Sequence, residues 1–297
     1  MSTQFLSLIK SITPHRSQII SLLLLKDNRI ASCSYDSTIK IYDPSNDYHC
    51  DIIITSHTLA VLSLCQLDNS NIVSCSDDLS IKIFSITKDS YSLINSYDKA
   101  HSKPVSKLIT LSNNRYASAS NDATIKIWSQ APYKDTPIAT LQCERDVFSI
   151  LEMKDKDLLI SGGFDRMLRI WDLKSYQCIS VVKETQCFSR NSLYQIDNDR
   201  VAVGEDCKIT IVNIPKCIIE SRIEDKEFGY VSSIMKLNED VMLYGCYNGK
   251  YVKYDLNSKK YEINNDMHTG NVSDMIKLTN ESFVTCSFDN CIKVWKY

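Results

Sequence analysis

The sequence predicts an all-β protein, a seven-bladed β-propeller with four antiparallel strands in each blade. One observation is an internal repeat, in which a small hydroxyl residue precedes an Asp by four positions and an aromatic residue follows that Asp by six, as at 32–43, 118–129 and 285–296. Another is the spacing, since the copies are 41 to 44 residues apart. Such periods with strand-like content are typical of propeller blades. The seven turn residues are Asp36, Asp78, Asp122, Asp165, Asp206, Asn248 and Asp289.

Each repeat is expected to supply four strands in a fixed order. The inner strand comes first, as at 61–67 and 272–278, and two middle strands flank the turn Asp, whose side chain favours a tight turn. Apolar residues alternate around Lys40 and Lys126, which supports strands at those positions. A variable outer strand comes last. The six outer strands are expected at 50–56, 92–98, 137–143, 178–184, 217–223 and 260–264.

The seventh blade is one strand short, because the chain reaches Tyr297 directly after that blade's third strand. The segment 4–10 precedes His15 at the distance at which other outer strands precede the next repeat. We therefore expect residues 4–10 to pair with residues 291–297 and to close the ring, because an open strand edge needs a partner. Residues 1–297 are then one complete propeller domain without an appended catalytic domain.

Composition narrows the function classes. The chain has 43% hydrophobic and 24% charged residues and a formal net charge of −2, which indicates a soluble globular protein. No Lys/Arg block is present, which argues against nucleic acid as a partner. The longest apolar stretch, residues 19–25, is too short to span a bilayer, so no membrane is expected either. The first residues do not resemble a signal peptide, which favours the cytoplasm or alternatively the nucleus.

The 12 Cys residues are interpreted as free thiols in the core rather than as disulfides or zinc ligands. No Cys-x-x-Cys pair occurs, and no secretory signal is seen. Four of them share one position of the repeat, where a small, weakly polar side chain suits a buried strand. These four are Cys33, Cys75, Cys246 and Cys286. We expect neither a metal nor a cofactor.

A second spacing accompanies the first, since four of the five His residues lie 21 positions before a turn Asp. This register resembles the WD-repeat β-propeller family over the whole chain. In that family a His, a Ser or Thr, the turn Asp and a Trp form a hydrogen-bonded tetrad in a blade. The resemblance implies complete tetrads at His101, Ser118, Asp122 and Trp128, and at His268, Thr285, Asp289 and Trp295. It implies incomplete ones at His15, Ser32 and Asp36, and at His57, Ser74 and Asp78.

Several blades depart from the pattern. Tyr42 and Phe84 replace Trp in the first two blades, and Cys143 lies near the His position of the fourth. Blades five and six are identified by spacing alone, with Ala202 and Tyr244 at the Ser position. The tetrads resemble catalytic Ser–His–Asp triads, but a set that recurs in several blades favours a structural role. No P-loop, Gly-x-Ser-x-Gly or His-Glu-x-x-His motif occurs, so no catalytic residue and no enzymatic activity is expected.

Family resemblance also implies where partners bind, on the face around the mouth of the central channel. In such propellers this face is lined by the residue before each turn Asp and by the two residues that flank the first apolar residue of each inner strand. Aromatic side chains among them would anchor a partner, and acids beside them suit a segment that carries Lys or Arg. The expected partner-binding residues are Ile20, Tyr35, Asp77, Asp146, Phe148, Phe164, Arg190, Glu205, Tyr230, Tyr247 and Phe288.

Arg190 stands where other blades begin the inner strand with Val, and we expect it near Asp146 or Glu205. It is either one half of a structural ion pair or a residue that recognises an acidic group on a ligand. The function expected is a non-enzymatic scaffold or adaptor, a monomeric ring that joins complexes with other proteins. One alternative is an architectural subunit that is held by its sides. Another is a substrate receptor of a ubiquitin ligase, although Lys174 replaces the Arg of the usual Trp-Asp-x-Arg motif.

Overall fold

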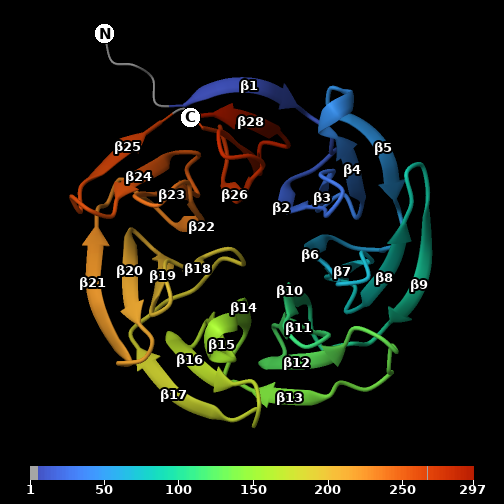
Figure 1. Ribbon diagram of the computed structural model, residues 1–297, viewed down its shortest axis with the longest axis horizontal. Coiled ribbons are helices and arrows are strands. Elements are labelled where there is room, and N and C mark those ends of the chain that lie inside the picture. Colours follow the sequence, from blue (N-terminus) through green and yellow to red (C-terminus); the bar gives the residue numbers. More distant parts are fainter. Residues whose placement is uncertain (1–5, 266) are drawn as a thin grey trace.

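The computed structural model describes residues 6–265 and 267–297, and within them the strands form seven four-stranded antiparallel sheets. The sheets are the blades of a ring, with one strand of each along the central channel and one at the rim (Figure 1). The predicted seven-bladed β-propeller is confirmed. Besides strands, the described residues contain two short 3-10 turns, Pro44–Asn46 and Lys154–Lys156.

Within each of blades one to four, the strands follow one another from the channel to the rim. Blade one contains β2 (Ile19–Leu24), β3 (Ile30–Ser34), β4 (Ile39–Asp43) and β5 (His49–Ile54). Blade two contains β6 (Val61–Gln66), β7 (Ile72–Ser76), β8 (Ile81–Ile86) and β9 (Tyr91–Tyr97). Blade three contains β10 (Val105–Leu111), β11 (Arg115–Ser120), β12 (Thr124–Ser129) and β13 (Ala139–Gln142). Blade four contains β14 (Val147–Met153), β15 (Leu158–Gly163), β16 (Met167–Asp172) and β17 (Cys178–Lys183).

Blades five and six keep the same order, and blade seven borrows its outer strand from the start of the chain. Blade five contains β18 (Leu193–Gln195), β19 (Arg200–Glu205), β20 (Lys208–Asn213) and β21 (Ile218–Glu224). Blade six contains β22 (Val231–Lys236), β23 (Val241–Cys246), β24 (Tyr251–Asp255) and β25 (Tyr261–Asn264). Blade seven contains β26 (Val272–Lys277), β27 (Ser282–Ser287), β28 (Ile292–Lys296) and β1 (Ser7–Ile12).

The ring closes through β1, which lies antiparallel against β28 at the outside of blade seven (Figure 1). Ser7 pairs with Lys296, and Ile12 pairs with Ile292. The closing strand therefore begins and ends later than the predicted segment 4–10, whose first two residues lie outside the described part of the chain. Directly before β1, Leu6 is 2% exposed and packs in one cluster with Phe283 and Trp295.

The hydrophobic core is divided among the contacts between neighbouring blades. One cluster, for example, joins Ile39 and Ile41 of blade one to Val61, Ile72 and Phe84 of blade two. Apolar residues on strands buried on both faces account for this division, because each sheet packs on a sheet at either side. All twelve Cys residues are free thiols, and the four at the shared repeat position are buried within these layers.

An irregularity near the start of the inner strands changes which side chains face outward. The pairing register shifts after the first residue of the strand in β2, β6, β10, β14, β22 and β26, as between Val105 and Lys107. The extra residue of such a bulge is turned out of the regular alternation. The hydroxyl of Ser106 donates to the carbonyl of Val147, and that of Ser273 donates to the carbonyl of Ile19, both at 2.5 Å. These residues therefore join adjacent blades instead of facing solvent.

Blade five departs from the others at its inner strand. β18 has three residues and begins at Leu193, so Arg190 lies in the preceding turn and not in the strand. The hydroxyl of Ser192 donates to the carbonyl of Ser189 at 2.7 Å and stabilises this turn. In the described part of the chain, no helix is long and apolar enough to cross a membrane.

Candidate partner-binding site

A buried polar network joins the strands of blade three. Nδ1 of His101 lies 2.9 Å from Oδ2 of Asp122, and Nε2 lies 2.7 Å from the Ser118 hydroxyl. The carboxylate can only accept, so Nδ1 carries the proton and Nε2 accepts from Ser118. The indole N–H of Trp128 donates to the Ser118 oxygen at 2.8 Å. Every polar group in this chain of contacts has a partner, which stabilises the blade.

Blade seven repeats the full arrangement, and blades one and two repeat part of it. In blade seven, His268 lies 2.9 Å from Asp289 and 2.7 Å from Thr285, to which Trp295 donates at 2.9 Å. In blade one, His15 contacts Asp36 and Ser32 at 2.8 and 2.7 Å, with the Tyr42 hydroxyl 3.3 Å from Ser32. In blade two, His57 contacts Asp78 and Ser74 at 2.9 and 2.7 Å, and the Phe84 ring packs without a hydrogen bond.

Charges in these networks are fixed by their surroundings. Burial acts to raise the pKa of Asp122, but hydrogen bonds from His101, Thr124 and the Ser102 amide outweigh it and hold the pKa well below its usual range. Burial lowers the pKa of His101 more than the neighbouring carboxylate raises it. A neutral imidazole beside a carboxylate is the result. The Ser118 hydroxyl is fully buried, which leaves no room for a substrate.

The sequence contains a further member of each network that we did not identify from it. The ammonium of Lys126, four residues after Asp122, donates to the Ala100 carbonyl directly before His101 at 2.6 Å. A Lys at the same place in three other blades donates to the residue before the His. These pairs are Lys40 with Pro14, Lys82 with Ser56, and Lys293 with Met267. The recurring Lys in the third strand of these repeats was the available signal.

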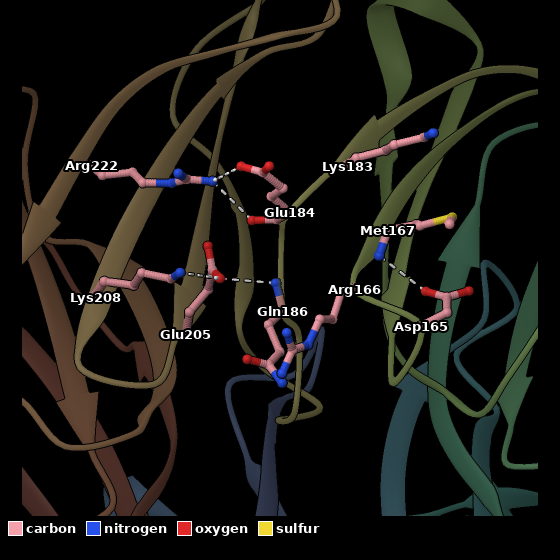
Figure 2. Close-up of a pocket in the computed structure, with 9 residues that line it drawn as sticks. All are labelled: Asp165, Arg166, Met167, Lys183, Glu184, Gln186, Glu205, Lys208 and Arg222. Atoms are coloured by element: carbon pink, nitrogen blue, oxygen red, sulfur yellow. Dashed lines mark hydrogen bonds and ion pairs between the residues drawn. The ribbon is translucent and has the colours of Figure 1, made fainter.

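Blade five has a different carboxylate in its network, and this corrects the sequence-based assignment. Glu205, expected on the partner-binding face, is 1% exposed and accepts from the Gln186 amide at 2.9 Å and from the Thr210 hydroxyl. Lys208 lies 3.4 Å from it (Figure 2). Asp206, the predicted turn acid, is exposed. Glu is one methylene longer than Asp, which lets it reach the same amide from one position earlier.

Glu205 lies in a hollow of about 310 Å³ between blades four and five. Figure 2 shows the residues that line it. Arg222 forms an ion pair of 3.5 Å with Glu184 and donates to its carbonyl at 2.9 Å. Asp165 pairs with Arg169, outside the hollow, and accepts from the Met167 amide at 3.0 Å. Most charges of this hollow are therefore matched within the protein.

An uninterrupted row of six aromatic rings lies on the face formed by the turn loops. Each ring meets the next in an edge-to-face contact, which aromatic pairs favour. In order the rings are Tyr35, Phe288, Tyr247, Tyr230, Phe188 and Phe164, with centroids 6.2, 5.7, 6.2, 5.7 and 5.5 Å apart. We call this row the aromatic arc. It runs from blade one through blades seven, six and five to blade four, and Phe188 is the member that the sequence-based selection missed.

The aromatic arc borders a hollow of about 680 Å³ at the channel mouth. Phe164 and Tyr247 are 50% and 54% exposed, and Tyr35 and Tyr230 are also exposed. The hollow is further lined by residues that precede the inner strands, among them Arg190 and Asn271. The face therefore offers apolar ring surface around a recess that contains polar groups.

Other residues expected on this face have different positions. Ile20 is 3% exposed and packs between blades one and two, because the bulge in β2 turns it inward, so its assignment was wrong. Asp77 is half-buried at the turn of blade two. Asp146 and Phe148 are half-buried and line a separate hollow of about 540 Å³, which shares Phe164 with the first.

Arg190 has no partner of the kind that we expected. Glu205 is bound to Lys208, and among the described residues Arg190 forms no ion pair with any carboxylate. Its buried Nε has no hydrogen-bond partner within the described structure. Asp77 lies close enough to be influenced, but burial raises the pKa of Asp77 more than the attraction to Arg190 lowers it.

Further hydrogen bonds join different blades at or just before their inner strands. The Lys107 ammonium donates to the Asn191 side-chain oxygen, and the Asn191 amide donates to the Ser273 carbonyl at 2.9 Å, which joins blades three, five and seven. Asp274 accepts from the Ser21 hydroxyl at 2.8 Å and from the Leu22 amide at 2.9 Å. Burial lowers the pKa of Lys107 and raises that of Asp274. These contacts satisfy the polar groups of Asn191 and Asp274 within the protein.

Comparison with known proteins identifies the repeat. The family model described as WD domain, G-beta repeat matches residues 6–43, 49–85, 92–129, 135–172 and 262–296, more than half of the chain. The unmatched stretch contains blades five and six, where the tetrad residues are missing. No curated protein sequence matches the chain. Within residues 6–265 and 267–297, no cluster of His, Cys, Asp and Glu is arranged to hold a metal ion.

Proposed function

The chain belongs to the WD-repeat family of β-propellers, and on this premise we propose that it is a non-catalytic scaffold. Members of this family are typically protein-interaction modules. The proposed scaffold binds a peptide segment or a subunit of another protein at the aromatic arc, and it joins complexes as a single ring.

The observation that carries this proposal is the aromatic arc itself. Four of the six rings are exposed, Phe188 and Phe288 are half-buried between them, and the row borders a hollow of about 680 Å³. Exposed apolar surface on such a scale is typical of interaction sites. Tyr and Phe are effective anchors because they bury a large area and lose little conformational entropy.

At the Phe164 end of the aromatic arc, the proposed partner contributes a basic side chain. Of the three acids that suggested a Lys- or Arg-containing segment, Glu205 is buried within the fold. Asp77 is half-buried at the turn of blade two, and Asp146 is half-buried in one hollow with Phe164. Asp146 forms no ion pair among the described residues and lies in the hollow that contains Phe148 and Phe164. A cation there could contact both charge and ring faces.

A second candidate function, that of an architectural subunit held by its sides, has its own support. Large apolar side chains are exposed on the outer strands, including Ile53 on β5, Leu93 on β9, Ile179 on β17 and Ile218 on β21. Burial of these residues in an assembly would leave the aromatic arc free.

One experiment distinguishes the two. The tagged chain is isolated from its native cells as the parent, as Tyr247→Ala/Phe288→Ala and as Ile179→Ser/Ile218→Ser, and the co-purifying proteins are quantified by mass spectrometry. We expect the arc variant to lose about tenfold or more of its specific partners, because anchor residues carry most of the binding energy. Ile179→Ser/Ile218→Ser, the rim variant, is the matched control and should retain these partners. Loss from the rim variant alone would instead support the architectural subunit. Melting curves verify that both variants are folded.

A further inference from the structure

The hollow beside the aromatic arc contains a positive charge that the fold leaves without a partner. The Arg190 guanidinium can donate up to five hydrogen bonds, yet none to another described residue is formed and its buried Nε is unsatisfied. Five other blades have Val at the corresponding position, namely Val61, Val105, Val147, Val231 and Val272. The propeller therefore does not require a charge at this place.

A second unsatisfied group lines the same hollow. Asn271 of blade seven is 5% exposed, and its side-chain oxygen has no hydrogen-bond partner among the described residues. Buried polar atoms without partners destabilise a fold, so they are rare unless a ligand or water satisfies them. A strong donor and an acceptor thus share one recess, surrounded by rings.

Neighbouring carboxylates do not neutralise Arg190. Asp77 is the acid whose pKa responds to it, but the two form no ion pair within 4 Å. Asp274, deeper in the channel, is already satisfied by the Ser21 hydroxyl and by backbone amides. Lys107, Asn191 and Ser273 are hydrogen-bonded to one another and not to Arg190.

We infer that the hollow binds an Asp or Glu side chain of the partner segment, with its carboxylate on the Arg190 guanidinium. This inference rests on the proposed function, because the flanking residues of that segment pack on the aromatic arc. An amide N–H of the segment is a suitable donor for the free oxygen of Asn271. Guanidinium and carboxylate form paired, charge-assisted hydrogen bonds, which fix orientation as well as affinity. Rings border the recess from blade one to blade four. An acidic side chain within the segment, unlike a chain end, lets residues on both sides of it contact these rings.

The probe is a set of peptides selected from a random library displayed on phage, with the full-length protein as bait. Selected sequences are synthesised, and their affinities are measured by titration against the parent protein and its variants. We expect the selected peptides to share an Asp or Glu next to apolar residues. Exchange of that acid for its amide should weaken binding to the parent about tenfold or more, which corresponds to 1.4 kcal/mol or more.

Protein variants locate the effect. Arg190→Gln should weaken binding of the acidic peptide to the same extent, and this variant should bind the acidic peptide and its amide counterpart equally. Arg190→Lys should recover part of the preference for the acidic peptide. Arg16→Gln, at an exposed Arg that lines neither of the two hollows, is the matched control and should leave binding unchanged. Only the backbone of Arg190 is engaged, through a hydrogen bond from Ser149, so these variants should fold as the parent does.

The outcomes separate the inference from the function on which it rests. If peptides bind Phe288→Ala weakly but bind Arg190→Gln as tightly as the parent, the inference is overturned and the proposed function is not. Enrichment of Lys and Arg without a shared Asp or Glu, together with sensitivity to Asp77→Asn, also overturns the inference. Binding that depends on a free peptide C-terminus instead of the internal acid contradicts the side-chain assignment. Peptides insensitive to both Phe288→Ala and Arg190→Gln, or no selected peptides at all, overturn the proposed function as well.

Discussion

In blade five the carboxylate of Glu205 performs the hydrogen bonding that Asp36 performs in blade one. Asp36 accepts from the Arg16 amide at 3.0 Å, and Glu205 accepts from the amide of Gln186, which has the same place in its repeat. The Thr210 hydroxyl and the Lys208 ammonium complete the surroundings of this buried charge. The missing His of this blade is thus compensated by other donors.

We predict that Glu205→Ala destabilises the protein strongly and that Asp206→Ala does not. Loss of Glu205 removes hydrogen bonds to a charged group and leaves the Thr210 hydroxyl and the Gln186 amide without a partner, at a cost of about 2–4 kcal/mol. Asp206 is exposed, so its replacement should change the free energy of unfolding by less than about 0.5 kcal/mol. Chemical denaturation of both variants tests this. The reverse order would show that Asp206 is the turn acid after all.

Spacing alone could not have identified this exchange. The repeat register assigned the turn acid to Asp206, because the sequence contains two adjacent acids and the period fits the second. Which one is buried depends on which hydrogen-bond donors the fold brings within reach of each side chain, and the sequence alone does not show this. By contrast, the His–Asp spacing of 21 residues correctly paired His101 with Asp122, because that register is repeated in four blades.

At the scale of single elements, pairing with β1 keeps β28 from being the open edge of its sheet. The ladder from Ser7 to Ile12 covers the backbone of β28, and the buried side chain of Leu6 packs beside Trp295. Leu8 and Ile9, in contrast, face solvent. The stabilisation from this segment therefore comes from backbone pairing and from Leu6.

Deletion of residues 1–10 should lower the melting temperature by about 5–10 °C. The deletion removes most of the ladder and the Leu6 side chain, which alone contributes about 2–5 kcal/mol. It also exposes β28, which should promote association between chains. A synthetic peptide of residues 1–14 added in excess should restore much of the loss, and a scrambled peptide should not. An unchanged melting curve would disprove that β1 stabilises the ring.

Bulges explain where element prediction succeeded and where it did not. The strands were predictable because apolar alternation and turn residues recur in each copy. The bulge in β2 was not, because it depends on pairing with β3, and it turned Ile20 from an expected surface residue into a core residue. Phe188 was missed for a related reason, since blade five has a three-residue inner strand and its turn does not follow the register.

At the scale of the whole molecule, ring closure creates the aromatic arc. Its rings come from five blades, and Tyr35 meets Phe288 only because blade one lies against blade seven. The sequence predicted that the ring closes and which turn residues are aromatic. It could not predict that the rings touch in one row, since this depends on distances between loops more than 200 residues apart in the chain, such as those of Tyr35 and Phe288.

Stability of the ring is also distributed, because polar networks recur in four separate blades. In blades one, three and seven, burial lowers the pKa of the network His. In all four, hydrogen bonds hold the pKa of the turn Asp below its ordinary range in spite of burial. The four networks respond to acid in the same direction, so their effects on the free energy of unfolding add.

We therefore predict that stability falls as the pH falls below about 6.5. Between that pH and the lowered pKa values of His15, His101 and His268, the unfolded chain binds protons that the folded chain does not, which favours unfolding. Below about pH 4 the turn carboxylates add to the loss as they approach their own lowered pKa values. The melting temperature should decrease by at least about 5 °C from pH 7.5 to pH 5. His101→Gln should make this dependence shallower, whereas His49→Gln, at the exposed fifth His, should not. A melting temperature independent of pH over this range, or an equal slope in the His101 variant, would show that the networks do not govern the acid sensitivity of the ring.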